Sequence, residues 1–463
     1  MKNLLKTNKK TKCESPLSFD SSVTYLNDGF EWAKKQALYY VHHGEDRVGL
    51  WYEAALPRRQ SFCMRDIAHQ SVGASGLGLH PHTKNMLYKF AENIAESRDW
   101  CSYWEIHRDD KPTPVDYKND HDFWYNLPAN FDVIRVCYAQ YLWTGDSDYL
   151  NHPVFDHFYR RSVDDYVRVW DKDGDGIIEH RPEYGRRGIA SYNEVGLKPA
   201  IGGDQIAAQF AGYTAYARIL QLRGDKDTAI GLLRKAHDLR ELYESSWWDE
   251  SNRRFYGAFL QDRRYLENYY AEGNFLPLLF GIIKNDNQRR LALADLMKNG
   301  VANVEGKTYL PDIYYLNGLK EQAYKELSEL MDPGLHRREY PEVSYAVIGA
   351  IITGMMGIAG DGQGLVSTFS NLTDEVSWAK VENVPILDRN ISVVHRGLIE
   401  TQFTNISGES LTWKASFANE HDALVYQGDH LIPQQEIGAD GLVRSYVLLS
   451  VQSGQTCTIT TVV

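Results

Sequence analysis

Apolar residues recur at helical spacing along most of the chain and then change to short alternating runs. The helical part predicts about eleven or twelve helices, among them residues 25–42, 84–97, 153–170, 226–247, 269–284, 288–298, 316–330 and 343–358. After Gly360, short runs between Gly, Asn and Asp turns predict strands. We therefore expect a mobile polar tail at 1–15, a mainly α domain at 16–362 and a β-sandwich-like domain at 363–463.

Three long polar segments, residues 51–70, 104–132 and 171–194, interrupt the helices and each precedes one. Ordering such long connections costs entropy that an idle link would avoid, so segments of this kind are more often functional. Polar and aromatic side chains of the first two segments are predicted to bind substrate: Arg65, Asp66, His69, Trp104, His107 and Trp124. The simpler alternative for Asp66 is a structural ion pair with a nearby Arg.

Paired helices with aromatic and acidic loops at one end are typical of an α/α toroid, in which inner helices line a cleft. The sequence resembles the six-hairpin glycosidase superfamily, the (α/α)6 glycoside hydrolases that often carry a β-sandwich, at 171–179, 311–323 and 338–344 and in its strand-rich tail. The resemblance implies an (α/α)6 toroid followed by a small all-β domain. It also implies a glycosidase that acts on an oligosaccharide or glycan with two carboxyl groups, with inversion as the expected outcome.

The resemblance places one catalytic carboxyl group in the loop after the Asp-rich segment. Glu183 and Glu194 compete for this general-acid role, because the loop lacks the Ser-Gly-Trp-Asp or Ser-Gly-Met-Asp sequence of some members. We prefer Glu183, since a half-buried site beside Tyr184 would raise a carboxyl pKa as a general acid requires. A surface acid that pairs with Arg186 or Arg187 is the alternative explanation.

The resemblance places the second carboxyl group just before the final inner helix, where Glu339 and Glu342 lie. We prefer Glu342 as the base, because Pro341 and the small and apolar residues that follow would seat it at a helix start. A carboxylate at that position is also favoured by the helix dipole alone, which is the competing explanation.

Arginines occur in all three candidate segments of this acidic protein: Arg58, Arg59, Arg65, Arg186, Arg187, Arg337 and Arg338. Guanidinium groups bind carboxylates bidentately, so a uronic acid is one predicted substrate. Neutralisation of neighbouring Asp and Glu explains the arginines equally well. The remaining predicted substrate ligands are Arg186, Arg187, Tyr192, Asn193 and Arg338.

The start of the third segment resembles a calcium loop, with carboxylates at Asp171, Asp173, Asp175 and Glu179. Pro182 stands at the twelfth place, where an EF-hand has a bidentate Glu, so the sequence is not an EF-hand. A helix-terminating turn stabilised by Asp side chains is favoured over calcium, and no cofactor is expected.

The net charge of −12 argues against a nucleic acid partner, which needs clustered Lys and Arg. The 30 Tyr and 11 Trp suit stacking on sugar faces, although many will fill helix interfaces. The five scattered cysteines predict reduced, buried thiols. The basic N-terminus is not followed by an apolar run, so we expect a cytoplasmic protein without a membrane anchor.

Two other functions compete with a hydrolase. A polysaccharide lyase on the same toroid would use a Tyr or His base and an Arg or Asn that neutralises a uronate; the candidates are His69, His107, Tyr184, Tyr192 and Asn193. A non-catalytic carbohydrate-binding protein would have no use for paired carboxyl groups. An isomerase or epimerase is less favoured, because no pair of histidines lies on the late helices.

Overall fold

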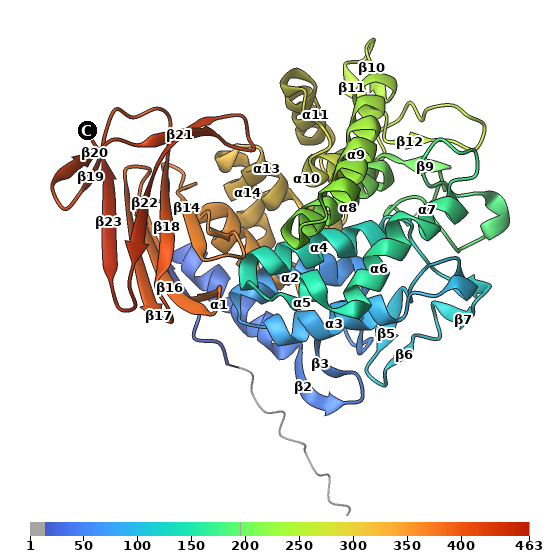
Figure 1. Ribbon diagram of the computed structural model, residues 1–463, viewed down its shortest axis with the longest axis horizontal. Coiled ribbons are helices and arrows are strands. Elements are labelled where there is room, and N and C mark those ends of the chain that lie inside the picture. The colour runs from blue at the N-terminus through green and yellow to red at the C-terminus, as the bar shows by residue number, and fades with distance from the viewer. Residues whose placement is uncertain (1–13, 195, 463) are drawn as a thin grey trace, which may run out of the picture.

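The computed structural model describes residues 14–194 and 196–462, so residues 1–13 of the predicted tail lie outside the described residues. Helices dominate the chain as far as Met355, and strands dominate the remainder (Figure 1). The mainly α fold class with a following all-β domain is therefore confirmed.

The helices alternate along the chain between an outer and an inner ring. The inner ring consists of α2 Met64–Gly76, α4 Ala129–Thr144, α8 Gly203–Arg223, α10 Ala271–Phe280, α13 Leu310–Leu316 and α15 Pro341–Gly349. The outer ring consists of α1 Thr24–Tyr39, α3 His80–Glu92, α6 Pro153–Val163 with α7 Asp165–Trp170, α9 Lys226–Ser246, α11 Asp286–Asn299 and α14 Lys320–Met331. Neighbouring inner helices contact each other, and α15 with its π-helical continuation Ala350–Met355 contacts both α13 and α2, which closes an (α/α)6 toroid.

The pattern of buried residues along two consecutive helices distinguishes an outer helix from an inner helix. Outer helix α9 buries a single stripe at helical spacing: Ala229, Leu232, Ala236, Leu239 and Tyr243. Inner helix α8 is buried on nearly every side as far as Leu220. A one-sided apolar stripe suits a helix with one wet face, and all-round burial suits a helix enclosed by others. Helix α13 matches no predicted helix, because its seven residues are too few to display a helical period.

Helices α2 and α15 pack closely, and Gly73 makes this possible. A Cβ atom at Gly73 would lie 2.1 Å from the carbonyl oxygen of Tyr345, which is too short for any real contact. Because Gly has no Cβ, the two backbones can approach at this point. The first turns of the same two helices carry Asp66 and Glu342.

The connections that enter the inner helices contain short hairpins, which the sequence did not predict. Their strands are β2 Val41–Asp46, β3 Gly49–Tyr52, β4 Ser61–Cys63, β5 Glu105–His107, β6 Lys111–Pro112, β7 Tyr117–Asn119, β8 Asp122–Phe123, β9 Ile201–Gly202, β10 Trp248–Asp249, β11 Arg254–Phe255 and β12 Ala258–Phe259. The same connections contain the short helices η1 Glu96–Arg98, η2 Pro182–Tyr184 and α12 Val304–Lys307, whereas α5 Asp148–Asn151 follows α4.

Two sheets form the C-terminal domain. The first has the order β1 Ser18–Ser21, β15 Trp378–Ile386, β16 Arg389–Arg396, β17 Glu400–Ser407, β23 Thr456–Thr461, β19 Leu424–Tyr426 and β20 Asp429–Leu431. The second has the order β13 Ala359–Gly360, β14 Leu365–Phe369, β18 Leu411–Ala418, β22 Val443–Val451 and β21 Gln434–Ile437. Phe403 of the first sheet stacks on Trp413 of the second with ring centroids 5.1 Å apart, so the sheets share a core.

The domain that ends the chain also contains the first described strand. Strand β1 pairs with β15 in antiparallel register, with Phe19 opposite Val381. Trp143 at the end of α4 fixes the two domains together, since its indole N–H donates to the Pro385 carbonyl oxygen at 2.8 Å. Among the helices of 14–194 and 196–462, none combines the length and apolar character of a membrane span.

Candidate active site

Every inner helix carries an acidic residue in its first turn. These residues are Asp66, Asp132, Asp204, Glu272, Asp312 and Glu342. A carboxylate near a helix N-terminus interacts favourably with the helix dipole. Each inner helix follows an outer helix that runs the other way, so the six N-termini lie at the same end of the toroid. The arrangement gathers five of these carboxyl groups at one mouth of the ring, whereas Asp312 of the short helix α13 lines a cavity on the side of the β-domain.

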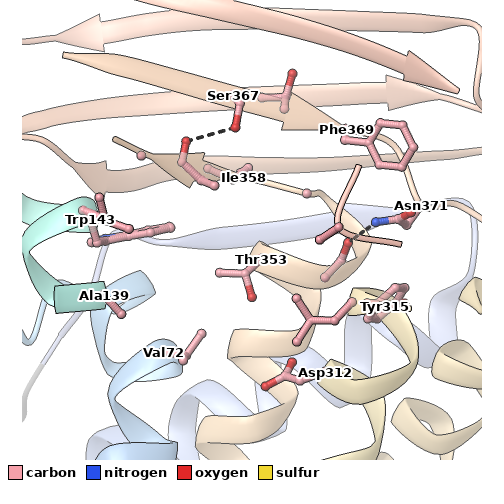
Figure 2. A pocket seen from close by; sticks show the side chains of 18 of the residues that line it. Val72, Ala139, Trp143, Asp312, Tyr315, Thr353, Ile358, Ser367, Phe369 and Asn371 are labelled. Atoms are coloured by element: carbon pink, nitrogen blue, oxygen red, sulfur yellow. Dashed lines mark hydrogen bonds between the residues drawn. The ribbon is translucent and has the colours of Figure 1, made fainter. Parts of the chain in front are cut away.

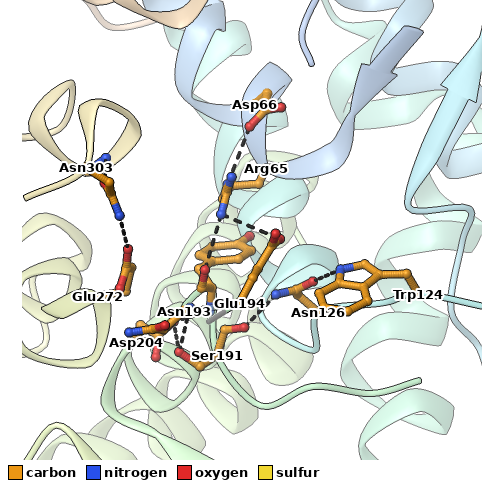
Figure 3. Close-up of polar contacts among 12 residues, drawn as sticks. Arg65, Asp66, Trp124, Asn126, Ser191, Asn193, Glu194, Asp204, Glu272 and Asn303 are labelled. Carbon is orange, nitrogen blue, oxygen red and sulfur yellow. Dashed lines mark hydrogen bonds and ion pairs between the residues drawn. The ribbon is translucent and has the colours of Figure 1, made fainter. Parts of the chain in front are cut away.

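Arg65, in the first turn of α2, lies at the centre of this mouth (Figure 3). Its Nη1 atom is 3.7 Å from Oε1 of Glu194, and its Nε donates to Oδ1 of Asp66 at 3.4 Å. Its guanidinium also donates to the Tyr192 carbonyl oxygen at 3.2 Å. Burial opposes the charge of Arg65, but Glu194 and Asp66 raise its pKa well above its ordinary value. Arg65 is thus a partly buried cation held between the third polar segment and α2.

Glu342 and Asp66 form a coupled pair of buried acids. Burial, and then the charge of Asp66, raise the pKa of Glu342 well above its ordinary value, and Glu305 and Glu194 act in the same direction. Burial raises the pKa of Asp66 to about 6, against the opposing charge of Arg65. Two adjacent carboxyl groups in a desolvated site do not both ionise easily, so the site favours the protonated form of one of them.

Asp204 and Asp132 hold the loop that carries Glu194. Asp204 accepts the Tyr192 backbone N–H at 2.6 Å and the Ser191 hydroxyl at 3.1 Å, and burial raises its pKa to about 7. The Tyr192 hydroxyl donates to Asp132 at 3.2 Å. These bonds fix the segment on the walls of the toroid, one residue before Asn193 and two before Glu194.

Three further side chains complete the mouth. Glu272 of α10 is buried and accepts a hydrogen bond from Asn303 at 3.4 Å, and burial raises its pKa. His69, one turn below Arg65, stacks on Tyr309 with ring centroids 3.9 Å apart. Burial lowers the pKa of His69 to about 3, so this imidazole is neutral at physiological pH.

The two other candidate catalytic residues lie on the surface. Glu183 is exposed on η2, where its charge acts on the adjacent His180 and Arg181. Glu339 is exposed just before α15, and its backbone carbonyl oxygen accepts hydrogen bonds from Gln36 and Tyr40. Of the four glutamates that the sequence singled out, the structure brings Glu194 and Glu342 together around Arg65.

Most of the predicted arginine ligands are occupied by the protein itself. Arg186 donates to Asp122 at 2.8 Å, and Arg187 pairs with Asp99. Arg338 donates to the Met331 carbonyl oxygen and lies over the Trp32 ring, 3.5 Å from its centroid. Partners of the other arginines are Glu105 for Arg59 and Glu305 for Arg337.

The aromatic and histidine residues of the second segment that were predicted to bind substrate differ in their distance from the mouth. The Trp124 indole donates to Asn126 at 2.7 Å, and Asn126 donates in turn to the Ser191 carbonyl oxygen at 2.6 Å, which links Trp124 to the Glu194 loop. Trp104 is buried next to the start of α2, where its carbonyl oxygen accepts the Met64 N–H at 3.1 Å. His107 instead forms a hydrogen bond with Asp109 at 2.8 Å.

The Asp-rich start of the third segment forms a turn. Asp171 accepts the backbone N–H groups of Gly174 and Gly176 at 2.7 and 2.9 Å. One oxygen each of Asp171, Asp173 and Asp175 lies within 4.8 Å of the others, whereas Glu179 pairs with Arg181 at 2.8 Å. The Asp171 carboxylate therefore stabilises the turn that follows the end of α7.

A cavity of about 470 Å³ lies at the other end of the inner helices, between the toroid and the β-domain (Figure 2). Trp143, Tyr315 and Phe369 supply aromatic walls, and Asp312 contributes a carboxyl group whose pKa burial raises to about 7. Arg65, Asp66 and Glu342 do not line it. The cavity is therefore distinct from the acidic mouth.

Several residues of the mouth were missed in the sequence: Asp132, Asp204, Glu272, Asn303 and Tyr309. An acid one to three residues after a predicted helix start is a readable signal, and Gly-Gly-Asp204 displays it. Asn303 and Tyr309 carry no such signal, because they precede the short helix α13 that the periodicity does not reveal.

No protein-family model and no curated protein matches the chain. Its structure is similar to the α-L-rhamnosidase from Dictyoglumus thermophilum (TM-score 0.65, 12% identity, covering 97% of this chain and 50% of that one). It is also similar to a rhamnosidase of family GH78 from Bacillus sp. GL1 (TM-score 0.62, 12% identity, 84% and 40%) and to a glycosidase in complex with glucose (TM-score 0.52, 11% identity, 72% and 98%).

The chain has the fold of the six-hairpin glycosidases. It spans about half the length of the rhamnosidases that it matches. At 11 to 12% identity these similarities show the architecture, an (α/α)6 toroid with a β-domain, and the chemistry has to be argued from the side chains of this chain.

Proposed function

We propose that this protein is a glycoside hydrolase in which Glu342 is the proton donor and Glu194 is the base that activates water. The placement of a buried carboxyl group of raised pKa, Glu342, and an exposed one, Glu194, around Arg65 carries the proposal. Glycosidic bond hydrolysis needs one protonated and one ionised carboxyl group on either side of the scissile bond. This assignment reverses the sequence-based roles, in which Glu342 is the base and the loop glutamate is the acid.

The electrostatic surroundings of the two glutamates indicate which one is the acid and which one is the base. A general acid has to hold its proton at the working pH, and the pKa of Glu342 is raised by burial and by three neighbouring acids. Glu194 is solvent-exposed at the rim of the mouth and lies 3.7 Å from the Arg65 cation, where water can reach it. The six-hairpin architecture, shared with proteins described as rhamnosidases and a glycosidase, supports the same class of reaction.

We infer that the substrate is a neutral glycan and not a uronate. Arg65 is the predicted arginine ligand that lies within the acid cluster, and it already pairs with Asp66 and Glu194. A uronate would have to displace one of these carboxylates and would approach several others. Turnover of matched neutral and uronic acid glycosides tests this inference: release of reducing sugar from the neutral series supports it, and preference for the uronides contradicts it.

The same experiment separates a hydrolase from a lyase, because a lyase releases an unsaturated product that absorbs in the ultraviolet. Burial raises the pKa of Tyr192 well above its ordinary value, and its hydroxyl donates to Asp132. A phenol in this state is a poor base. We therefore expect reducing sugar without the ultraviolet signal.

Asp66→Asn should move the alkaline limb of the pH profile of kcat/KM to lower pH. Glu342 works in its protonated form, so activity falls as pH rises through its pKa. The negative charge of Asp66 raises that pKa, and its removal lowers it. Arg65→Met should move the same limb to higher pH, because Arg65 acts in the opposite direction. Initial rates across a pH series measure both shifts. If the alkaline limb lies at the same pH in the wild type and in both variants, Glu342 is not the acid.

A further inference from the structure

A second cluster of polar side chains lies on the β2–β3 hairpin. His42, Glu45 and Asp46 each place one ligand atom within 4.8 Å of the others. The Nδ1 atom of His42 is 3.4 Å from Oε1 of Glu45 and 3.3 Å from Oδ2 of Asp46. The register of the hairpin shifts between His43 and Asp46, with Gly44 at a φ of 90°, and this bulge turns the three side chains toward one another.

The two distances from His42 exceed the close contact of a well-formed histidine–carboxylate hydrogen bond, and ligand atoms around a metal lie equally far apart. A hydrogen-bonded histidine and carboxylate approach to 2.8 Å, as His107 and Asp109 do in this chain. At His42 both separations are about half an ångström longer. A tetrahedral zinc ion with bonds of about 2.0 to 2.1 Å holds its ligand atoms about 3.3 to 3.4 Å apart. The observed 3.3 and 3.4 Å match that edge.

The side chains around the cluster have the arrangement that orients metal ligands. His42 is 5% exposed and its ring stacks on Trp51 at 4.0 Å. Its Nε2 atom, which has no hydrogen-bond partner among the described residues, faces Oε1 of the buried Glu53 at 3.6 Å. A metal-bound imidazole typically directs its other nitrogen to a carboxylate in this way.

Asp46 is supported in the same manner. Its Oδ2 accepts the Trp51 indole N–H at 3.0 Å, and its Oδ1 pairs with Arg108 at 2.6 Å. Each carboxylate oxygen has two lone pairs, so Oδ2 keeps one for a metal. Glu45 is half exposed and completes the cluster on its solvent side.

We propose that His42, Glu45 and Asp46 bind a divalent transition metal ion of the zinc type, with Glu53 orienting His42 through Nε2. One imidazole nitrogen and two carboxylate oxygens suit zinc and its neighbours better than calcium or magnesium, which prefer oxygen ligands alone. The ion would join the two ends of the bulge and so stabilise the hairpin. The alternative is a protonated His42 that neutralises the surrounding carboxylates without a metal.

Calorimetric titration of zinc chloride into the full chain, after removal of metals with a chelator, tests the proposal near neutral pH. We expect a single equivalent to bind and the thermal midpoint to rise, with no competition from calcium or magnesium. His42→Ala should abolish binding. Glu45→Gln, a surface change that leaves the core intact, should weaken it at least tenfold. His237→Ala is the matched control, because His237 lies 3.8 Å from Glu241 on the exposed face of α9 and should bind nothing.

Cobalt gives an independent readout, since a tetrahedral site with nitrogen and oxygen ligands produces visible absorption bands. These bands should appear with the wild-type chain and disappear with His42→Ala and Glu45→Gln. Absence of zinc binding, or zinc binding that both variants leave unchanged, would overturn the proposal. The alternative, in which His42 neutralises the surrounding carboxylates without a metal, would then be favoured. Tighter binding of calcium than of zinc would overturn the proposal as well.

Discussion

Glu342→Gln is expected to lower kcat by about a hundredfold to ten-thousandfold, the range associated with loss of a general acid. The side chain is buried in the first turn of α15, and burial and the neighbouring acids raise its pKa, which favours the protonated form. Gln has almost the same shape as a protonated Glu but has no acidic proton to give to the leaving oxygen. Substrate binding should change little, so the loss should appear in kcat more than in KM. Steady-state kinetics on a neutral glycoside measures it.

Two controls make this result specific. Glu339→Gln changes the same residue type three positions away, on the exposed connection before α15, and should retain wild-type activity. A substrate with a good leaving group needs less protonation, so Glu342→Gln should lose much less activity on it than on a natural glycoside. The unfolding midpoint of Glu342→Gln should not fall, because an uncharged side chain fits a buried site. Full activity of the variant would show that Glu342 is not catalytic.

The sequence predicts the fold well where periodicity is long and repeated. The stripe of α9 and the alternating runs of β15 to β18 are readable from local pattern, and the predicted fold class is confirmed. Strand β1 was not predicted from the sequence, because its pairing with β15 joins opposite ends of the chain and leaves no local pattern. The same reason explains why residues 16–362, predicted as one helical domain, contain strands that belong to the C-terminal sheets.

The site was predicted less completely, because it too depends on contacts between residues that are far apart in the sequence. Glu342 and Arg65 were singled out from their segments, but the preference for Glu183 depended on an expected burial beside Tyr184, whereas Glu183 is exposed. Sequence spacing does not show which of two glutamates in a loop faces the ring. That choice depends on the bonds from Asp204 to the Tyr192 backbone, which only the packed structure reveals.

Arg65 explains how so many acids are tolerated at one mouth. A buried cation must be paired, and buried acids near a cation lose part of their desolvation penalty. Arg65 lowers the pKa of Asp66 and of Glu342 against the larger effect of burial, and it holds Glu194 at 3.7 Å. It therefore acts as a shared counter-ion for the acids of the mouth.

Glu194→Ala is expected to lower kcat/KM by about a hundredfold to ten-thousandfold, as loss of a general base does. Because Glu194 is exposed at the rim of the mouth, its removal leaves an opening that a small anion can enter. Formate or azide should therefore restore part of the activity, whereas neither should rescue Glu342→Gln, in which the buried site stays filled. Rates measured against anion concentration show the rescue.

Glu183→Ala is the decisive comparison, because it removes the same residue type from the same loop. With Glu194 as the base, Glu183→Ala should stay within about twofold of the wild type, as expected for an exposed charge on a surface turn. If instead Glu183→Ala loses activity and Glu194→Ala keeps it, the loop must rearrange around the substrate to bring η2 to the mouth, and the pairing across Arg65 is wrong. If both variants keep full activity, the second carboxyl group has to be sought among the first-turn acids, and Asp66, with its pKa of about 6, is the next residue to replace.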